Sequence, residues 1–293
     1  MGKKSQKWIN GGLMVICLLI VYAFSSKTDV AKIISIEDAI KTGTIQVAMT
    51  ANGGFSENSI ALKIINKTAD DLKLIVKAGS VFYSTDPGEQ ELVLPIDHLI
   101  LVKSRAQVHE QLSAYCTESS DKIPAQNGKL TMKQSSNKKL LELTTYFNKN
   151  KLSPVTYQDA IWSVTDQHPI SNIVVNTKED RDLRTFIAGL TGLKDVWYSS
   201  PQERVVSPDR QIIQETVTIS GDLSFKTKVG AVVHQEIHNK ENGLLFKSDK
   251  RNTIKTGTVD YSFTIKVRGW DKGEYEIRVL EGSTLIANYP FSI

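Results

Sequence analysis

The sequence predicts a mainly β protein with a helical cap, in which an N-terminal β-sandwich or barrel domain precedes a second β-sandwich. Two observations lead to this expectation. Short apolar segments alternate with polar residues between Ser59 and Cys116, and again after Thr216, as half-buried strands do. Between these halves, apolar residues recur at the i, i+3, i+4 spacing of amphipathic helices.

The N-terminus predicts export. Lys3, Lys4 and Lys7 precede the apolar run Leu13–Phe24, and Ala23-Phe24-Ser25 offers small residues at the spacing that signal peptidase recognises. Since the run is shorter than the stretch of about 20 residues that spans a bilayer, we expect a cleaved signal peptide at residues 1–25. An uncleaved membrane anchor is the alternative. Either way, the rest of the chain is expected in the periplasm, at the cell surface or in the medium.

Charge argues against one class of partner. The formal net charge is +4, and it falls to about +1 without the three N-terminal lysines. No basic stripe remains, so we expect no nucleic-acid binding. A hydrophobic content of 40% predicts a folded chain. Its length suits two domains, which we place at residues 29–203 and 206–293.

The first domain is expected to open with a short helix at Ser35–Lys41, capped by the Ser35 hydroxyl and followed by Gly43 for a left-handed exit. The expected strands, which have the short, regular spacing of a sandwich or barrel, are Ser59–Ile65, Leu72–Val76, Val81–Tyr83, Glu91–Leu94, Leu99–Val102 and Val108–Tyr115.

Three helices are expected to cap this β domain. The first spans Lys138–Asn148, and the third, after Thr177, spans Glu179–Leu190. The second begins with Ser153 as N-cap and a proline at the first helical position, and it ends before Pro169. The polar segment Tyr198–Pro208, with two prolines, is the expected linker between the domains.

The second domain resembles an immunoglobulin-like sandwich. Asp271, Gly273 and Tyr275 match the Asp-x-Gly-x-Tyr-x-Cys pattern of that fold, with Ile277 in place of the disulfide cysteine. The resemblance implies that the Tyr275 hydroxyl bonds back to the backbone at a strand corner. The expected strands of this domain are Thr216–Ser220, Ala231–Ile237, Thr258–Val267, Glu274–Leu280 and Leu285–Ile293.

One cysteine, Cys116, remains after the export segment. A lone thiol in an oxidising compartment is either a buried core residue or a group whose sulfur is used chemically. Tyr115-Cys116 and the later segment Tyr157-Gln158-Asp159-Ala160-Ile161-Trp162 resemble the signature of the thioester domains of bacterial surface adhesins. In that family a cysteine is joined to the glutamine of a Thr-Gln-x-Ala-Ile-Trp motif, and Tyr157 here replaces the threonine.

The resemblance implies that the Cys116 sulfur displaces ammonia from the Gln158 carboxamide, which gives an internal thioester for a target amine to attack. Trp162, one helical turn after Gln158, is then expected to shield the acyl carbon from water. The structural alternative is an inert, buried Cys116 and an ordinary packed helix face.

Other motifs predict no catalytic or metal site. His234 and His238 lie four residues apart in an expected strand, without a third ligand nearby in sequence, and we expect no zinc site there. The sequence also carries no recognisable nucleophile–base pattern, phosphate loop or cofactor motif.

We therefore expect a non-enzymatic, exported surface or envelope binding protein without cofactor. Its partner is an unidentified protein or surface ligand, and membrane contact is expected only through an uncleaved N-terminal segment. The alternative is a structural or scaffolding envelope protein.

Overall fold

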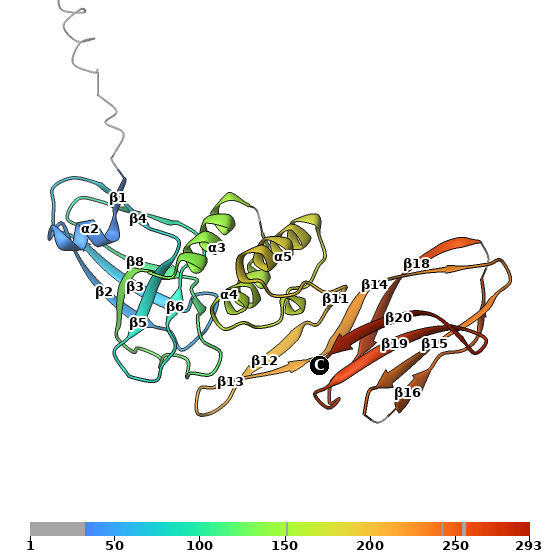
Figure 1. The fold of residues 1–293 in the computed structure, drawn as a ribbon. Helices are drawn as coiled ribbons and strands as arrows, with labels where there is room; N and C mark the ends of the chain where they lie inside the picture. The colour runs from blue at the N-terminus through green and yellow to red at the C-terminus, as the bar shows by residue number, and fades with distance from the viewer. Residues whose placement is uncertain (1–32, 151, 242, 254–255) are drawn as a thin grey trace, which may run out of the picture.

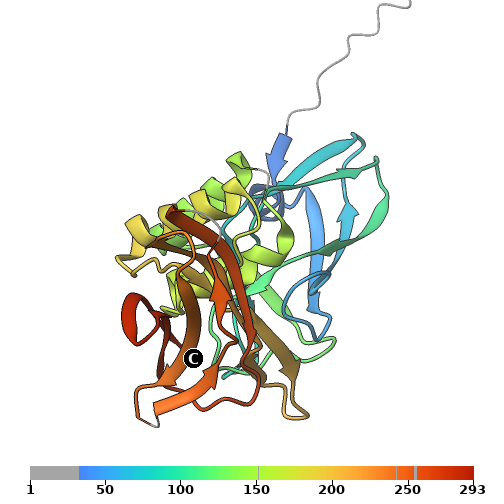
Figure 2. The ribbon, with the colours of Figure 1, turned by 90° about the vertical axis from the view of Figure 1, so that its right-hand side faces the viewer.

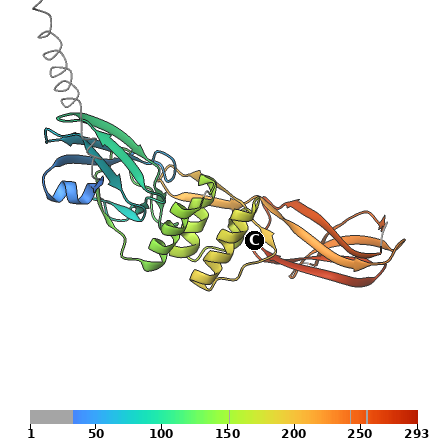
Figure 3. The same cartoon turned by 90° about the horizontal axis from the view of Figure 1, so that it is seen from above.

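The computed structural model describes residues 33–150, 152–241, 243–253 and 256–293. The expected signal peptide or anchor at residues 1–25 lies outside the described residues. The described chain is mainly β, as predicted, and its three parts follow one another in a row: N-terminal sheets, helices and C-terminal sandwich (Figures 1 and 3). Every helix in this described part is too short or too polar to traverse a bilayer.

The N-terminal part consists of three open sheets around one core. Their strand orders are β1-β4-β7, β2-β3-β8 and β10-β5-β6-β9. Since none of these sheets closes on itself, the arrangement fits the expected sandwich and not the barrel. The elements are β1 (Ile33–Ser35), α2 (Ile36–Lys41), β2 (Ile45–Ala51), β3 (Ile60–Asn66), β4 (Leu72–Val76), β5 (Ser80–Ser84), β6 (Leu92–Val93), β7 (His98–Val102), β8 (Gln107–Leu112), β9 (Tyr115–Cys116) and β10 (Leu130–Gln134).

Local sequence explains most of these elements. Ser35 caps α2 by accepting a hydrogen bond from the Asp38 N–H at 3.1 Å, and Gly43 leaves the helix with a φ of +71°, both as expected. Strand β3 buries alternate residues, as its apolar pattern predicts. Strand β2 is absent from the sequence expectation, although Ile45, Val47 and Met49 alternate with the exposed Gln46 and Ala48. It pairs with β3 along its whole length.

The helical cap contains α3 (Lys138–Lys149), α4 (Tyr157–Thr165) and α5 (Lys178–Thr191), with short 3-10 turns η1 (Pro154–Thr156) and η2 (Ile170–Asn172). Thr177 and Asp180 form a reciprocal capping box at the start of α5. Ser153 lies at the N-cap position of η1 and is followed by Pro154, as expected, but its side chain makes no cap hydrogen bond, and α4 itself begins only at Tyr157.

The expected linker Tyr198–Pro208 is instead ordered β structure. Strand β11 (Tyr198–Ser199) pairs with the C-terminal sheet, whereas β12 (Gln202–Val206) and β13 (Ile212–Thr216) form a hairpin. This hairpin and the helices α3 and α5 lie on opposite sides of the long axis (Figures 1 and 2). Ile212 of the hairpin belongs to the N-terminal core. The hairpin therefore connects the N-terminal part to the C-terminal sandwich, and β12 spans the domain boundary that we expected at residues 203–206.

The C-terminal part is the expected immunoglobulin-like sandwich. One sheet has the order β11-β14-β18, and the other has the order β16-β15-β19-β20 with β17 also paired to β15. The Tyr275 hydroxyl donates to the Asp271 carbonyl at 2.6 Å, which confirms the expected tyrosine corner. The strands are β14 (Thr218–Thr227), β15 (Val232–Asn239), β16 (Gly243–Lys247), β17 (Arg251–Asn252), β18 (Gly257–Lys266), β19 (Glu274–Glu281) and β20 (Thr284–Ser292).

Candidate functional site

The structure brings Cys116 and Gln158 together at a sheet edge. Strand β9 is the last strand of its sheet. On its paired side, the Thr117 N–H bonds to the Glu91 carbonyl at 3.0 Å, so the Cys116 N–H and C=O point toward the open edge. The Gln158 side chain forms hydrogen bonds with both of these backbone groups. Its Oε1 accepts from the Cys116 N–H at 3.2 Å, and its Nε2 donates to the Cys116 carbonyl at 2.9 Å.

Helix α4 holds Gln158 in this position through its neighbours. The Tyr157 ring packs edge-on against the Tyr115 ring, with 5.6 Å between the ring centroids, and it is tilted against the Phe147 ring, with 4.6 Å between the centroids. Both tyrosines are buried, and such aromatic pairs add stability beyond their buried area. The first turn of α4 is thus fixed to β9 on one side and to α3 on the other. The Gln158 carboxamide has little freedom to leave the sheet edge.

The Cys116 and Gln158 side chains are both buried. Cys116 is 0% exposed and Gln158 is 3% exposed. Burial, with a smaller contribution from the Glu118 carboxylate, raises the pKa of the Cys116 thiol well above its ordinary value. The sulfur is therefore a thiol rather than a thiolate at neutral pH.

Trp162 lies in the same hydrophobic cluster as Cys116 and is fully buried. The Arg204 guanidinium, from strand β12, lies 5.0 Å above the Trp162 ring. Arg204 also forms an ion pair with Asp159, the residue that follows Gln158. Burial raises the pKa of the Asp159 carboxyl, and Arg204 opposes that shift. The hairpin thus covers Trp162 and the helix turn that carries Gln158.

An open surface pocket of ≈ 410 Å³ leads to this corner. Gln158, Tyr115 and Arg204 line it, together with the loop residues Phe55, Ser56 and Glu57. Burial raises the pKa of Tyr115 to about 12, and the negative charge of the exposed Glu57 adds to this shift. The pocket lining thus carries one acidic side chain, Glu57, and one basic side chain, Arg204, whose charge is paired with Asp159.

The arrangement supports two different roles. Edge strands leave backbone groups unpaired, and a buried N–H or C=O needs a partner, which the Gln158 amide supplies. The same two bonds also fix a carboxamide beside a cysteine with its carbonyl oxygen facing a backbone N–H. Such a donor can stabilise negative charge when a nucleophile attacks the carbonyl carbon.

The other sequence candidates lie elsewhere. His234 and His238 both contact one carboxylate, that of Glu236, at 3.2 and 3.0 Å, and Lys247 contacts it as well at 2.9 Å. In this cluster His234 is buried, Glu236 and His238 are partly buried, and Lys247 is half-exposed. No group of metal-ligating side chains capable of holding an ion occurs within the described ranges.

Sequence reasoning missed Arg204 and Glu57 as neighbours of Gln158. Arg204 lies in the segment expected to be a linker, and Glu57 lies in a loop between two strands. Arg204 is a single cation in a polar segment, and nothing in that segment specifies a partner 45 residues earlier in the chain.

Comparisons with known proteins add no family. No protein-family profile matches the sequence, and no curated protein matches it. Among solved structures, a β-glucosidase from Kluyveromyces marxianus aligns with 80% of this chain and 44% of its own at 9% identity, with a TM-score of 0.21. The chain thus spans less than half of that protein's length, and a similarity this low carries no argument.

Proposed function

We propose that this chain is an exported cell-envelope or surface binding protein that forms an internal thioester between Cys116 and Gln158 and uses it to capture a target amine. The bonded form reacts once per molecule, so the protein is a covalent adhesin-like binder rather than an enzyme. The immunoglobulin-like domain serves as its stalk or spacer. The basic N-terminal residues and the apolar run Leu13–Phe24 support export.

The observation that carries the proposal is the pair of hydrogen bonds between the Gln158 carboxamide and the Cys116 backbone. In bond formation, the Cys116 sulfur attacks the Gln158 carboxamide carbon while the Cys116 N–H stabilises the developing oxyanion. The thiol proton passes to the amide nitrogen, the C–N bond breaks, and ammonia leaves. Since burial keeps the proton on sulfur, this proton is available for the departing nitrogen.

Capture reverses the roles of sulfur and nitrogen. A primary amine entering by the pocket beside Gln158 attacks the acyl carbon, forms an amide and releases the Cys116 thiol. The exposed Glu57 carboxylate in the pocket wall favours approach of a cationic amine such as a lysine side chain. The buried ring of Trp162 supports the proposal because a dry environment slows competing hydrolysis.

A second candidate is a non-catalytic envelope structural protein with an inert cysteine. The full burial of Cys116 favours this candidate, as does the ability of Gln158 to act only as a partner for the sheet edge.

Incubation of the purified chain with a biotinylated primary amine separates the two candidates. The proposal predicts a label attached to Gln158 in tandem mass spectra. Cys116→Ala and Gln158→Ala are expected to remain unlabelled, whereas Gln46→Ala, which removes an exposed glutamine of β2, labels like the wild type. Absence of label in the wild type, or undiminished labelling of Cys116→Ala, contradicts the proposal.

A further inference from the structure

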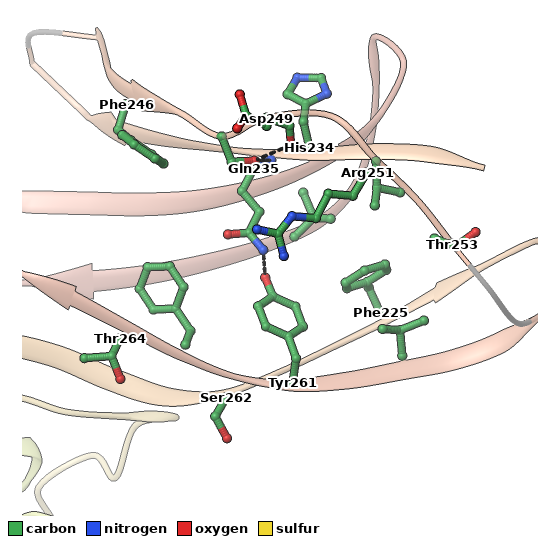
Figure 4. Close-up of a pocket in the computed structure, with 15 residues that line it drawn as sticks. Phe225, His234, Gln235, Phe246, Asp249, Arg251, Thr253, Tyr261, Ser262 and Thr264 are labelled. Carbon is green, nitrogen blue, oxygen red and sulfur yellow. Dashed lines mark hydrogen bonds between the residues drawn. The ribbon is translucent and has the colours of Figure 1, made fainter. Parts of the chain in front are cut away.

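The C-terminal sandwich contains a cavity that is separate from the Cys116–Gln158 site. It has a volume of ≈ 610 Å³ and lies between the two sheets near the edge strands β16 and β18 (Figure 4). Its apolar walls come from both sheets, namely from Phe225, Val233, Phe246, Val259, Phe263 and Val279. The volume is within the range of about 300–1,000 Å³ that is usual for small-molecule sites.

The cavity exists because the sandwich is incompletely filled at this edge. The inward residues of the central strand β14, including Leu223 and Phe225, are buried. By contrast, Val259, Tyr261 and Phe263, which alternate on β18, are only half-buried. Protein interiors are normally close-packed, and the atoms that line a void lose their dispersion contacts. An apolar ligand body would restore those contacts.

Two hydrogen-bond donors face this apolar space. The Tyr261 hydroxyl accepts a hydrogen bond from the Gln235 Nε2, and its own proton has no acceptor among the described residues. Burial raises the pKa of Tyr261, so that proton is retained. Arg251 has no ion pair or side-chain hydrogen bond within the described part of the chain, and its side chain reaches into the cavity (Figure 4).

The acidic and imidazole groups of the lining do not occupy the same space. Asp249 lies at the upper rim in the view of Figure 4, and the His234 ring points away from the cavity toward the outer face of the sheet. His234 there contacts Glu236 at 3.2 Å. Among the described lining residues, the cation whose side chain reaches into the cavity is Arg251, and an anionic group there would complement its charge.

We propose that this cavity binds a small amphipathic carboxylate, with its apolar body between the two sheets and its carboxylate bonded to Arg251 and Tyr261. A guanidinium binds a carboxylate through charge-assisted hydrogen bonds, and the aliphatic or aromatic body fills the space between the phenylalanine and valine side chains. The inference does not depend on the thioester, because the cavity residues and Cys116 belong to different cores.

Calorimetric titration of the purified chain with decanoate and with decanol tests this inference, since the two probes differ only in the head group. We expect saturable binding of decanoate that is roughly tenfold tighter than that of decanol, because one charged hydrogen bond is lost with the alcohol. Arg251→Gln is expected to remove this preference and to leave decanol binding unchanged. Lys272→Gln, which removes an exposed charge at the tyrosine-corner turn, retains it.

A second variant tests the position of the apolar body. Val259→Phe on the edge strand β18 fills part of the cavity and is expected to weaken both probes. If Val259→Phe fails to fold, the comparison of Arg251→Gln with Lys272→Gln still decides the inference. No saturable decanoate binding by the wild type, equal affinity for acid and alcohol, or an acid preference that survives Arg251→Gln overturns it.

Discussion

The ion pair between Asp159 and Arg204 is expected to be the strongest single polar link between the hairpin and the helix that carries Gln158. The Asp159 and Arg204 side chains are 10% and 13% exposed, so both charges are largely shielded from water. Replacing Arg204 with methionine keeps the length of the side chain but leaves the Asp159 carboxyl without a cation. Breaking a buried pair in this way costs about 3–5 kcal/mol of unfolding free energy.

Loss of the guanidinium above the Trp162 ring adds to this cost by about 0.5–2 kcal/mol, since a partly desolvated cation–π contact has that strength. The double variant Asp159→Asn, Arg204→Met removes both charges at once. Because the buried charge is then gone, we expect it to be more stable than the sum of the two single variants predicts, by about 1–3 kcal/mol.

The pH dependence gives a second signature of the pair. Burial raises the folded-state pKa of Asp159 above its ordinary 3.8, so the folded protein binds this proton more tightly than the unfolded chain does. This group's effect on stability is therefore neutral at low pH and becomes unfavourable as the pH rises through that pKa. Without Arg204 the pKa rises further, and the deficit of Arg204→Met is expected to be largest at neutral pH.

Urea denaturation of the wild type, the two single variants and the double variant at neutral pH and near pH 4 measures these differences. A deficit below about 1 kcal/mol for Arg204→Met at neutral pH would place the pair among weak surface ion pairs. A deficit that does not shrink on acidification, or strictly additive single variants, would also refute the reasoning.

Three further outcomes follow from the structure. In Gln158→Ala, which cannot form the thioester, Cys116 is expected to react with iodoacetamide much more slowly in the folded than in the urea-unfolded state, because burial raises the thiol pKa; equal rates would contradict this. Hydrogen bonds from His238 and Lys247 lower the pKa of Glu236 to about 2. The ionised Glu236 therefore stabilises the fold above its ordinary pKa of 4.5, and this contribution is lost as the pH falls toward 2. Between pH 4.5 and 2, Glu236→Gln should lose less unfolding free energy than the wild type does, and equal losses in the two proteins would contradict this. A fragment of residues 194–293 is expected to melt above a fragment of residues 206–293, because only the longer one keeps β11, which pairs with β14; equal melting temperatures would show that β11 contributes nothing.

Local sequence patterns were sufficient for much of the fold. The alternation along β3 and β4 and the helical spacing after Thr177 are short-range signals, and the structure contains β3, β4 and α5. The tyrosine corner at Tyr275 likewise depends on residues only four apart. The proximity of Cys116 and Gln158 followed from a resemblance and not from spacing, since nothing local in either segment specifies a contact across 42 residues.

Contacts between distant segments could not be read in this way. The β12–β13 hairpin looks like a polar linker because its burial comes from a few residues such as Ile212, which packs into the other domain. Arg204 has the sequence appearance of a surface cation, although its partners lie on α4. The cavity beside β18 could not be predicted from the sequence either. Alternation of apolar and polar residues indicates which side chains point inward, but it does not indicate whether those side chains fill the space between the sheets.

The central claim is that Cys116 and Gln158 can form a covalent bond, and the intact mass of freshly purified protein tests it most directly. We expect a mass lower than that of the processed sequence by one ammonia, with the Cys116 and Gln158 peptides joined after digestion under mild conditions. Cys116→Ala should show no such loss, and methylamine should convert the wild type to a species with one methylamide at Gln158 and one free thiol. An unmodified mass, with a Cys116 thiol that is fully alkylated once the protein is unfolded, would contradict the claim and leave Gln158 as a structural partner of the β9 edge.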